Sequence, residues 1–211
     1  MRTRIFAPVV AALALAGCGA EEETAQPVPA TEPATQTETE TVTQPQTVTQ
    51  PPAQPRADCS TSTLRLTLPE EDIPAEVAEV RQRIFDAAVA CDYDALEQIA
   101  LEKGEGFTFS YGGGDSAAAH WRELEESGAE EPMRQLATIL TFPFTRNESG
   151  SYAWPTAYSE NPTEDAWRDL VYAGLYSAEE VDTMKTEGTG YLGYRTAITP
   201  DGDWQFFVAG D

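Results

Sequence analysis

The stretch 191-YLGYRTAITPDGDWQFFV-208 decides the fold class of this chain. Two runs rich in aromatic and β-branched residues, 191–198 and 204–208, flank the pentapeptide TPDGD at 199–203. An Asp-Gly pair between two such runs is a strong signal of a β-hairpin, because glycine readily adopts the positive φ that a tight turn requires. We therefore expect the chain to end in an antiparallel hairpin.

Other strands are expected upstream of this hairpin. The stretches LRLTL at 64–68 and FTFSY at 107–111 alternate apolar and polar residues, as half-buried strands do. A further short strand is expected at 152–154, within an otherwise irregular, proline-containing segment from 142 to 162.

Between the expected strands, apolar residues recur at helical spacing behind residues that begin helices. The expected starts are Asp72 with Pro74 in the first turn, Asp92, Asp115 or Ser116, Pro132, Thr163 and Ser177. The last of these fits the capping box, in which Ser177 and Glu180 each satisfy a free backbone amide. The order of strand, helices, strand, helices and hairpin predicts a single α+β domain with several short helices and a small, mainly antiparallel sheet.

The beginning of the chain has a different character. Arg2 and Arg4 precede an apolar run from 5 to 17. This run is shorter than the roughly 20 residues that a helix needs to cross a bilayer, and is typical of a secretory signal peptide. It ends in Leu15-Ala16-Gly17-Cys18, which resembles the lipobox of bacterial lipoproteins.

This resemblance covers residues 1 to about 20 only, because beyond the lipobox the chain resembles no characterised family. It implies that residues 1–17 are a cleaved signal peptide and that Cys18 carries a thioether-linked lipid and palmitate-type acyl chains, which together form a firm anchor. The expected location is the cell envelope: the outer membrane or the periplasmic face in a Gram-negative bacterium, and the outer leaflet of the cell membrane otherwise. The alternative is an ordinary secreted protein.

A tether is expected from 18 to 57. After Cys18 this segment consists almost entirely of Glu, Thr, Gln, Pro, Ala and Val, without an aromatic residue, Leu or Ile, so it cannot build a core. A recognition segment or a glycosylated Thr/Pro stalk remains an alternative interpretation. The folded domain is therefore expected to comprise residues 58–211.

The expected domain is strongly acidic. Its 10 lysines and arginines stand against 30 aspartates and glutamates, which leaves a net charge of −20. Nucleic-acid binding and attachment to anionic lipid both require clustered basic residues, so the charge argues against both. Cationic ligands and divalent metals are permitted.

Two cysteines remain after Cys18. Cys59 and Cys91 form an even pair in an exported domain, which predicts a disulfide that contributes about 3–4 kcal/mol on the chain-entropy model. Free thiols or a metal pair are the alternatives.

No complete catalytic motif is present. His120 is the only histidine, which excludes a multi-histidine metal site and leaves any Ser-His-Asp triad dependent on it. The nearest approach to a nucleophile elbow, at 108–112, has Thr where Gly is required. The sequence therefore predicts no catalytic residue, no cofactor and no bound metal.

One stretch is the best candidate for a ligand site. Glycines that precede a helix can present backbone amides to an anion, and a nearby histidine can exchange protons. The candidate residues are Tyr111, Gly112, Gly113, Gly114, Asp115, His120 and Trp121. The alternative is a tight turn with a capping residue and a structural histidine.

Two further sets of residues have a structural and a functional interpretation. Aromatic residues could stack on sugars or form the core; they are Tyr152, Trp154, Tyr158, Trp167, Tyr172, Tyr176, Tyr191, Tyr194, Trp204, Phe206 and Phe207. Asp201, Asp203 and Asp211 could hold Ca²⁺ or serve the hairpin turn.

The leading hypothesis is a lipid-anchored module of the cell envelope that binds a glycan or protein partner without chemistry of its own. The alternative is an envelope hydrolase that acts on glycan or peptidoglycan through a pair of carboxylates.

Overall fold

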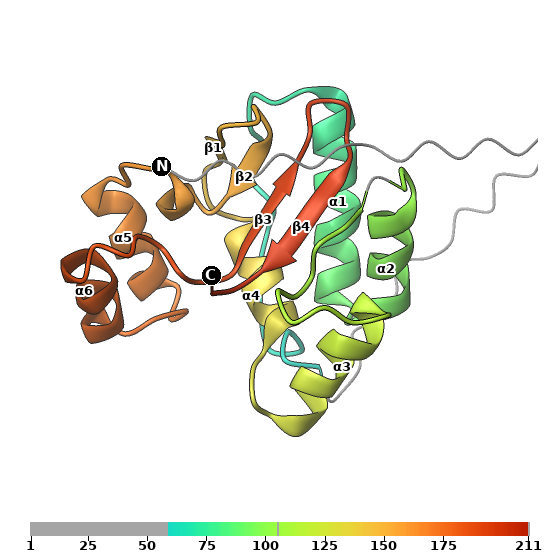
Figure 1. The fold of residues 1–211 in the computed structure, drawn as a ribbon, viewed down its shortest axis with the longest axis horizontal. Helices are drawn as coiled ribbons and strands as arrows, with labels where there is room; N and C mark the ends of the chain where they lie inside the picture. The colour runs from blue at the N-terminus through green and yellow to red at the C-terminus, as the bar shows by residue number, and fades with distance from the viewer. Residues whose placement is uncertain (1–58, 105, 211) are drawn as a thin grey trace, which may run out of the picture. The chain divides into compact units, whose positions relative to one another are not determined.

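The computed structural model describes residues 59–104 and 106–210. The signal peptide, the lipobox Cys18 and the tether predicted for 18–57 lie outside the described residues, as does Asp211. The described part is a mixed α+β domain with six α-helices and one four-stranded antiparallel sheet (Figure 1), so the predicted fold class is confirmed.

The helices begin mostly where capping residues predicted them. Asp92, Ser116, Thr163 and Ser177 each accept a hydrogen bond from a backbone amide of the helix that follows, and Ser177 and Glu180 form the complete capping box. The bounds are α1 Ala75–Val89, α2 Tyr93–Leu101, α3 Ala117–Ser127, α4 Pro132–Ile139, α5 Glu164–Tyr172 and α6 Ala178–Thr186, with a 3-10 helix η1 at Thr156–Tyr158. The prediction for Asp72 is wrong, because α1 begins after Pro74 without a side-chain cap.

The sheet has the order β1-β2-β3-β4, with every neighbouring pair antiparallel. Its strands are β1 Thr145–Arg146, β2 Tyr152–Trp154, β3 Arg195–Ile198 and β4 Trp204–Val208. The predicted hairpin is formed by β3 and β4, and Gly202 in its turn has a φ of +80°. A Cβ atom at Gly202 would also lie 3.0 Å from the carbonyl oxygen of Glu76, because the turn packs against α1.

Two predicted strands are wrong. Residues 64–68 alternate between half-buried and exposed, as the sequence pattern requires, yet they join no strand of the described sheet. Within 107–111, only Thr108 pairs, through an isolated parallel bridge to Phe206 on β4. Alternation of apolar and polar residues indicates which side chains are buried. A β-strand also needs a neighbouring strand with which its backbone can form hydrogen bonds. Residues 191–194 likewise precede β3 instead of extending it.

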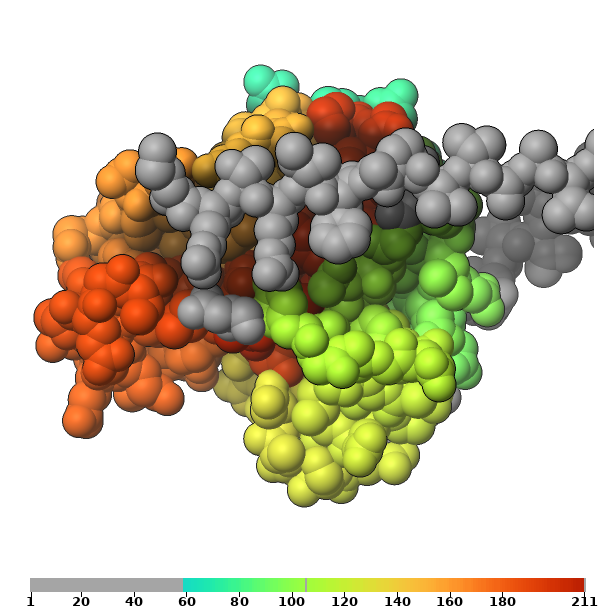
Figure 2. Space-filling model, viewed as in Figure 1, coloured from blue at the N-terminus to red at the C-terminus, as the bar shows by residue number. Residues whose placement is uncertain are grey.

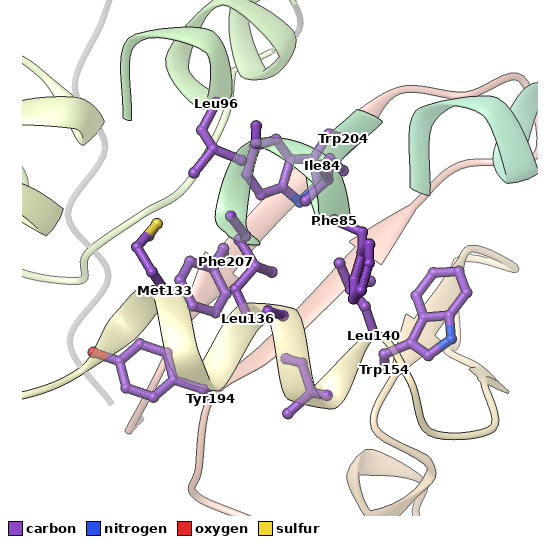
Figure 3. Packing of buried hydrophobic residues seen from close by; sticks show 14 of the residues in the cluster. Ile84, Phe85, Leu96, Met133, Leu136, Leu140, Trp154, Tyr194, Trp204 and Phe207 are labelled. Atoms are coloured by element: carbon purple, nitrogen blue, oxygen red, sulfur yellow. The ribbon is translucent and has the colours of Figure 1, made fainter. Parts of the chain in front are cut away.

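The main core lies between the sheet and the helices that cover one of its faces. Figure 3 shows Met133 and Leu136 of α4 beside Phe207, and Leu140, the residue after α4, beside Phe85 of α1. Helices α1 and α4 pack against each other and against β3, while α5 and α6 stand to one side (Figure 1). Among the described helices, none has both the length and the apolar character needed to cross a bilayer.

The predicted disulfide between Cys59 and Cys91 is present, with the two Cα atoms 5.9 Å apart. It joins the start of the described chain to the residue that follows α1 and its cap. Cys91 has a φ of +48°, which is unusual for a residue that carries a Cβ atom.

A buried ion pair connects the segment before α1 to the rest of the core. The Arg81 guanidinium lies 2.7 Å from the Glu71 carboxylate, and the two side chains are only 3% and 11% exposed. Glu71 also accepts hydrogen bonds from the Trp154 indole at 3.2 Å and from the Phe144 amide at 3.1 Å. Burial lowers the pKa of Arg81, and Glu71 opposes that shift.

Candidate functional site

The glycine-rich stretch that the sequence singled out forms a tight turn. Gly113 and Gly114 both have positive φ, and a Cβ atom on Gly114 would lie 3.0 Å from the Phe109 ring. Two of the amides that open α3 are already used: Ala118 donates to the Glu97 carboxylate at 3.2 Å, and Ala119 donates to the Ser116 hydroxyl oxygen at 3.1 Å. The Ser116 hydroxyl also donates to Glu97 at 2.7 Å. An internal carboxylate therefore occupies the position that an anionic ligand would take.

The other residues of this candidate site do not converge. Trp121 is 1% exposed and packs against Phe107, Trp204 and Phe207 in the core. His120 is half-buried, and its ring centroid lies 5.4 Å from that of Phe109. Asp115 is exposed. These positions correspond to the structural interpretation of the stretch.

Tyr111 is positioned by a residue that the sequence analysis did not identify. Arg195 on β3 is buried, and its guanidinium donates to the Tyr111 hydroxyl at 2.9 Å and to the Gly193 carbonyl at 3.3 Å. It also lies 5.2 Å from the centroid of the Tyr158 ring. Arg195 therefore ties the glycine-rich turn to the segment before β3. No sequence motif marks it, because a lone arginine in a strand usually reaches solvent.

A hollow in the described surface lies away from this stretch. A cavity of about 530 Å³ is bounded by the loop before α4, by α4 itself, by α6 with Tyr176 just before it, and by residues 192–194 before β3. We call it the α4–α6 groove. Figure 2 shows the orange-red α5–α6 region and the yellow-green region around α3 as separate projections on one face of the molecule.

The lining of the α4–α6 groove combines apolar walls with a few polar groups. The apolar and aromatic lining residues are Ala129, Tyr176, Met184, Leu192, Gly193, Tyr194 and Ala209. The polar lining residues are Glu130, Glu131, Gln135, Glu180 and Thr183. Mainly apolar walls with a small number of convergent polar groups are typical of ligand pockets, and the volume falls within their usual range.

Three tyrosines support the groove. The Tyr191 hydroxyl donates to the Tyr194 carbonyl at 2.8 Å, and the Tyr194 amide donates to the Tyr176 hydroxyl at 3.3 Å. The Tyr194 ring stacks on Phe207 with centroids 5.0 Å apart, and its hydroxyl points away from the core (Figure 3), where it donates to Glu130. A Cβ atom at Gly193 would lie 2.2 Å from the Tyr176 hydroxyl oxygen. The packing of the three tyrosines therefore leaves no room for a side chain at this position.

One polar atom of the groove has no partner. The Gln135 side-chain oxygen is buried, and none of the described groups donates a hydrogen bond to it. A buried acceptor that lacks a donor is destabilising by about 1–3 kcal/mol, so natural proteins keep few of them. Because the oxygen has almost no contact with solvent, the Gln135 amide must turn toward the groove before a ligand can reach it.

Alkaline pH should destabilise the protein through the tyrosine cluster. Burial raises the pKa of Tyr176, Tyr191 and Tyr194, and the hydrogen bond to Glu130 adds to the rise at Tyr194. Unfolded tyrosine ionises near pH 10, so above about that pH the unfolded chain loses protons first. We expect stability that is full below about pH 10 and falls above it, by up to about 1.4 kcal/mol per pH unit for each phenol.

Denaturant midpoints measured from about pH 8 to pH 11 test this expectation. The variant Tyr191→Phe serves as the matched comparison, because it removes one buried phenol and should flatten the alkaline slope. A midpoint that stays constant across this range would contradict the prediction.

Several carboxylates among the described residues serve structural hydrogen bonds. Glu71 and Glu97 are bonded as above, and Glu125 accepts from the Ser60 hydroxyl at 2.8 Å and the Met133 amide at 2.9 Å. Glu130 is bonded to Tyr194. A hydrolase of the predicted type would need two carboxylates placed for acid and base or nucleophile roles across a cleft.

The hairpin aspartates behave as turn residues in the part of the chain that the structure describes. The Thr199 hydroxyl donates to the Asp201 side chain at 2.5 Å, which lowers the pKa of Asp201. The Asp203 amide donates to the Thr199 hydroxyl at 2.9 Å. No group of three Cys, His, Asp or Glu side chains among the described residues is placed to hold a metal ion.

Most of the eleven aromatic residues considered as sugar-stacking candidates are part of the hydrophobic core instead. Seven of its members are buried: Tyr152, Trp154, Trp167, Tyr191, Tyr194, Trp204 and Phe207. Tyr158, Tyr176 and Phe206 are half-buried, and Tyr172 is 93% exposed. Only Tyr176 and Tyr194 of this set line the α4–α6 groove.

No family model, no curated protein and no solved structure matches the chain. A function must therefore be argued from the geometry and chemistry of the site.

Proposed function

We propose that this protein is a lipid-anchored module of the cell envelope that binds a ligand in the α4–α6 groove and catalyses no reaction. The observation that carries the binding proposal is the groove itself: about 530 Å³, apolar and aromatic walls, and a buried amide oxygen without a partner. The anchor rests on the lipobox sequence at 15–18. The location in the envelope follows from the anchor.

A second hollow supports binding less well. It has a volume of about 830 Å³ and is lined by residues 146–149 and 158–161. Apart from Tyr158 its lining residues are polar or charged, and they mix the Arg146 guanidinium with the carboxylates of Glu148 and Glu160. Small-molecule sites are usually dominated by apolar lining, which favours the α4–α6 groove.

We favour binding without catalysis over the hydrolase alternative, because the groove lacks an assembled reaction centre. Its lining contains no histidine, cysteine, serine or lysine. Its three carboxylates already have partners in the protein: Glu130 accepts from Tyr194, Glu180 accepts from the Ser177 amide, and Glu131 pairs with Arg134. General acid–base catalysis needs positioned groups that exchange protons with a substrate. Nothing in the described residues favours the hydrolase alternative.

Methionine resonances provide a direct test of binding. The chain holds three methionines; Met184 lines the groove, Met133 is buried in the core, and Met1 belongs to the predicted signal peptide. Full-length protein labelled at the methionine methyl groups would be purified in detergent and titrated with small neutral aromatic amides, amino sugars and short peptides.

We expect at least one of these compounds to shift the Met184 resonance while Met133 stays in place, with the compound recovered unchanged. The variant Met184→Leu assigns the resonance. A panel that never moves Met184 would contradict the groove as a binding site, and a compound that is cleaved would contradict the absence of chemistry.

The anchor makes an all-or-none prediction. Cys18→Ser removes the thiol to which the lipid would be attached, so the protein should incorporate no labelled palmitate and should leave the membrane fraction. Several acyl chains at about 0.8 kcal/mol per buried CH₂ bind firmly, so the unaltered protein should stay with the membrane in high salt. Membrane retention of the Cys18→Ser protein under those conditions would overturn the lipoprotein assignment.

A further inference from the structure

We propose that the α4–α6 groove selects a basic peptide segment, with an arginine or lysine side chain seated against Tyr176 and Tyr194. This inference rests on the proposed function, since it names the class of ligand that the same groove takes. The argument uses the charges of the rim, the direction of the hydrogen bonds, and the aromatic surface of the groove.

The charge of the groove favours a cation. Glu130, Glu131 and Glu180 are exposed at its rim, and its lining contains neither lysine nor arginine. Arg134 lies 3.6 Å from Glu131 and offsets one of these charges only. The surrounding domain carries a net charge of −20, which adds a long-range attraction for cations and a repulsion for anions.

The hydrogen bonds of the lining leave acceptors for the ligand. The Tyr194 hydroxyl donates to Glu130, and the Thr183 hydroxyl donates to the Glu179 carbonyl at 2.9 Å, so both donors are used within the protein. The buried Gln135 oxygen has no donor. A guanidinium or ammonium group carries several N–H donors and no acceptor, and is therefore complementary to this arrangement.

The aromatic and apolar walls suit the rest of such a side chain. The faces of tyrosine rings attract cations, and the aliphatic stems of arginine and lysine pack on apolar surface such as that of Met184 and Leu192. The volume of about 530 Å³ exceeds what a bare ion needs. No metal-binding group of side chains occurs in the described ranges either, so the cation belongs to an organic ligand.

An isosteric pair of peptides tests the inference. The probes are acetylated, amidated Arg-Trp-Arg and the same peptide with both arginines replaced by citrulline, which keeps the shape and removes the charge. Both are titrated into the full-length, detergent-solubilised protein, with the Met184 and Met133 methyl resonances as the readout. We expect the arginine peptide to shift Met184 and to bind at least about tenfold tighter than the citrulline peptide, because charge-assisted hydrogen bonds are the stronger ones.

Matched charge variants locate the effect. Glu130→Gln and Glu131→Gln should each weaken the arginine peptide several-fold and leave the citrulline peptide nearly unchanged. Glu126→Gln removes the same charge from an exposed residue of α3 that does not line the groove, and should change the affinity less than twofold. An unshifted Met133 resonance shows that each variant is folded. The affinity for the arginine peptide should also fall as salt rises, because the rim charges are exposed.

The outcomes separate this inference from the proposed function. Equal binding of the two peptides at Met184 overturns the selection of a cation and leaves binding in the groove intact. If neither peptide moves Met184 while neutral compounds do, only this inference fails. If no compound moves Met184, both fail. An equal loss of affinity in Glu126→Gln and Glu130→Gln shows unspecific attraction to an acidic protein, and also overturns the inference.

Discussion

Glu71→Gln should lower the free energy of unfolding by about 3–5 kcal/mol, the range measured when one partner of a buried ion pair is removed. The substitution leaves Arg81, whose side chain is 3% exposed, without its counter-charge. Arg81 would keep its hydrogen bonds to the Pro69 carbonyl at 3.0 Å and the Leu140 carbonyl at 2.6 Å, but neither carbonyl compensates a full charge. The glutamine amide would also present N–H groups toward the guanidinium.

The exposed pair between Arg83 and Glu102 supplies the control. These side chains are 39% and 45% exposed, so Glu102→Gln should cost at most about 1 kcal/mol. The double variant Glu71→Gln, Arg81→Met removes both buried charges and should recover part of the loss, since no uncompensated buried charge remains. Chemical denaturation measures all three. Equal losses for Glu71→Gln and Glu102→Gln would contradict the importance of burial.

Removing the disulfide should lower the free energy of unfolding by about 3–4 kcal/mol, because the bridge closes a loop between residues 32 apart in sequence and restricts the unfolded chain. The test compares Cys59→Ala, Cys91→Ala with the unchanged pair, both in a Cys18→Ser background that leaves no third thiol. Reductant should destabilise only the protein that retains the bridge. If reductant leaves its denaturation midpoint unchanged, the bridge does not stabilise the fold.

The backbone conformation of Cys91 suggests a second variant for this experiment. Its φ of +48° lies in the left-handed region, where a side chain is disfavoured by about 1–2 kcal/mol and glycine is not. Cys59→Ala, Cys91→Gly should therefore be more stable than Cys59→Ala, Cys91→Ala by up to that amount. Equal stability of the two variants would show that Cys91 relaxes to another conformation once the bridge is gone.

Local chemistry explains which parts of the fold could be predicted. The Asp-Gly turn, the caps at Asp92, Ser116 and Thr163, and the capping box of α6 depend on groups within a few residues of one another. Such interactions operate in almost any surroundings, so the pattern of residue types is sufficient to predict them.

Pairing and site formation depend on residues that are distant in sequence. The alternation at 64–68 correctly indicated one buried side, but no edge of the described sheet is paired with it. The glycine-rich turn before α3 could have bound an anion, had Glu97 on α2 not accepted from the Ser116 hydroxyl and the Ala118 amide. In both cases the deciding partner lies outside the motif.

The sequence by itself determined the α+β class, the terminal hairpin, most of the helix starts and the cysteine pair, because short-range preferences and the burial pattern depend on neighbouring residues. Only the tertiary structure decided that Tyr176, Gln135, Met184 and Tyr194 share one groove, since α4, α6 and the segment before β3 meet there from separate parts of the chain. The physical reason is that a cavity is the volume left unfilled when elements pack, and no single segment specifies it.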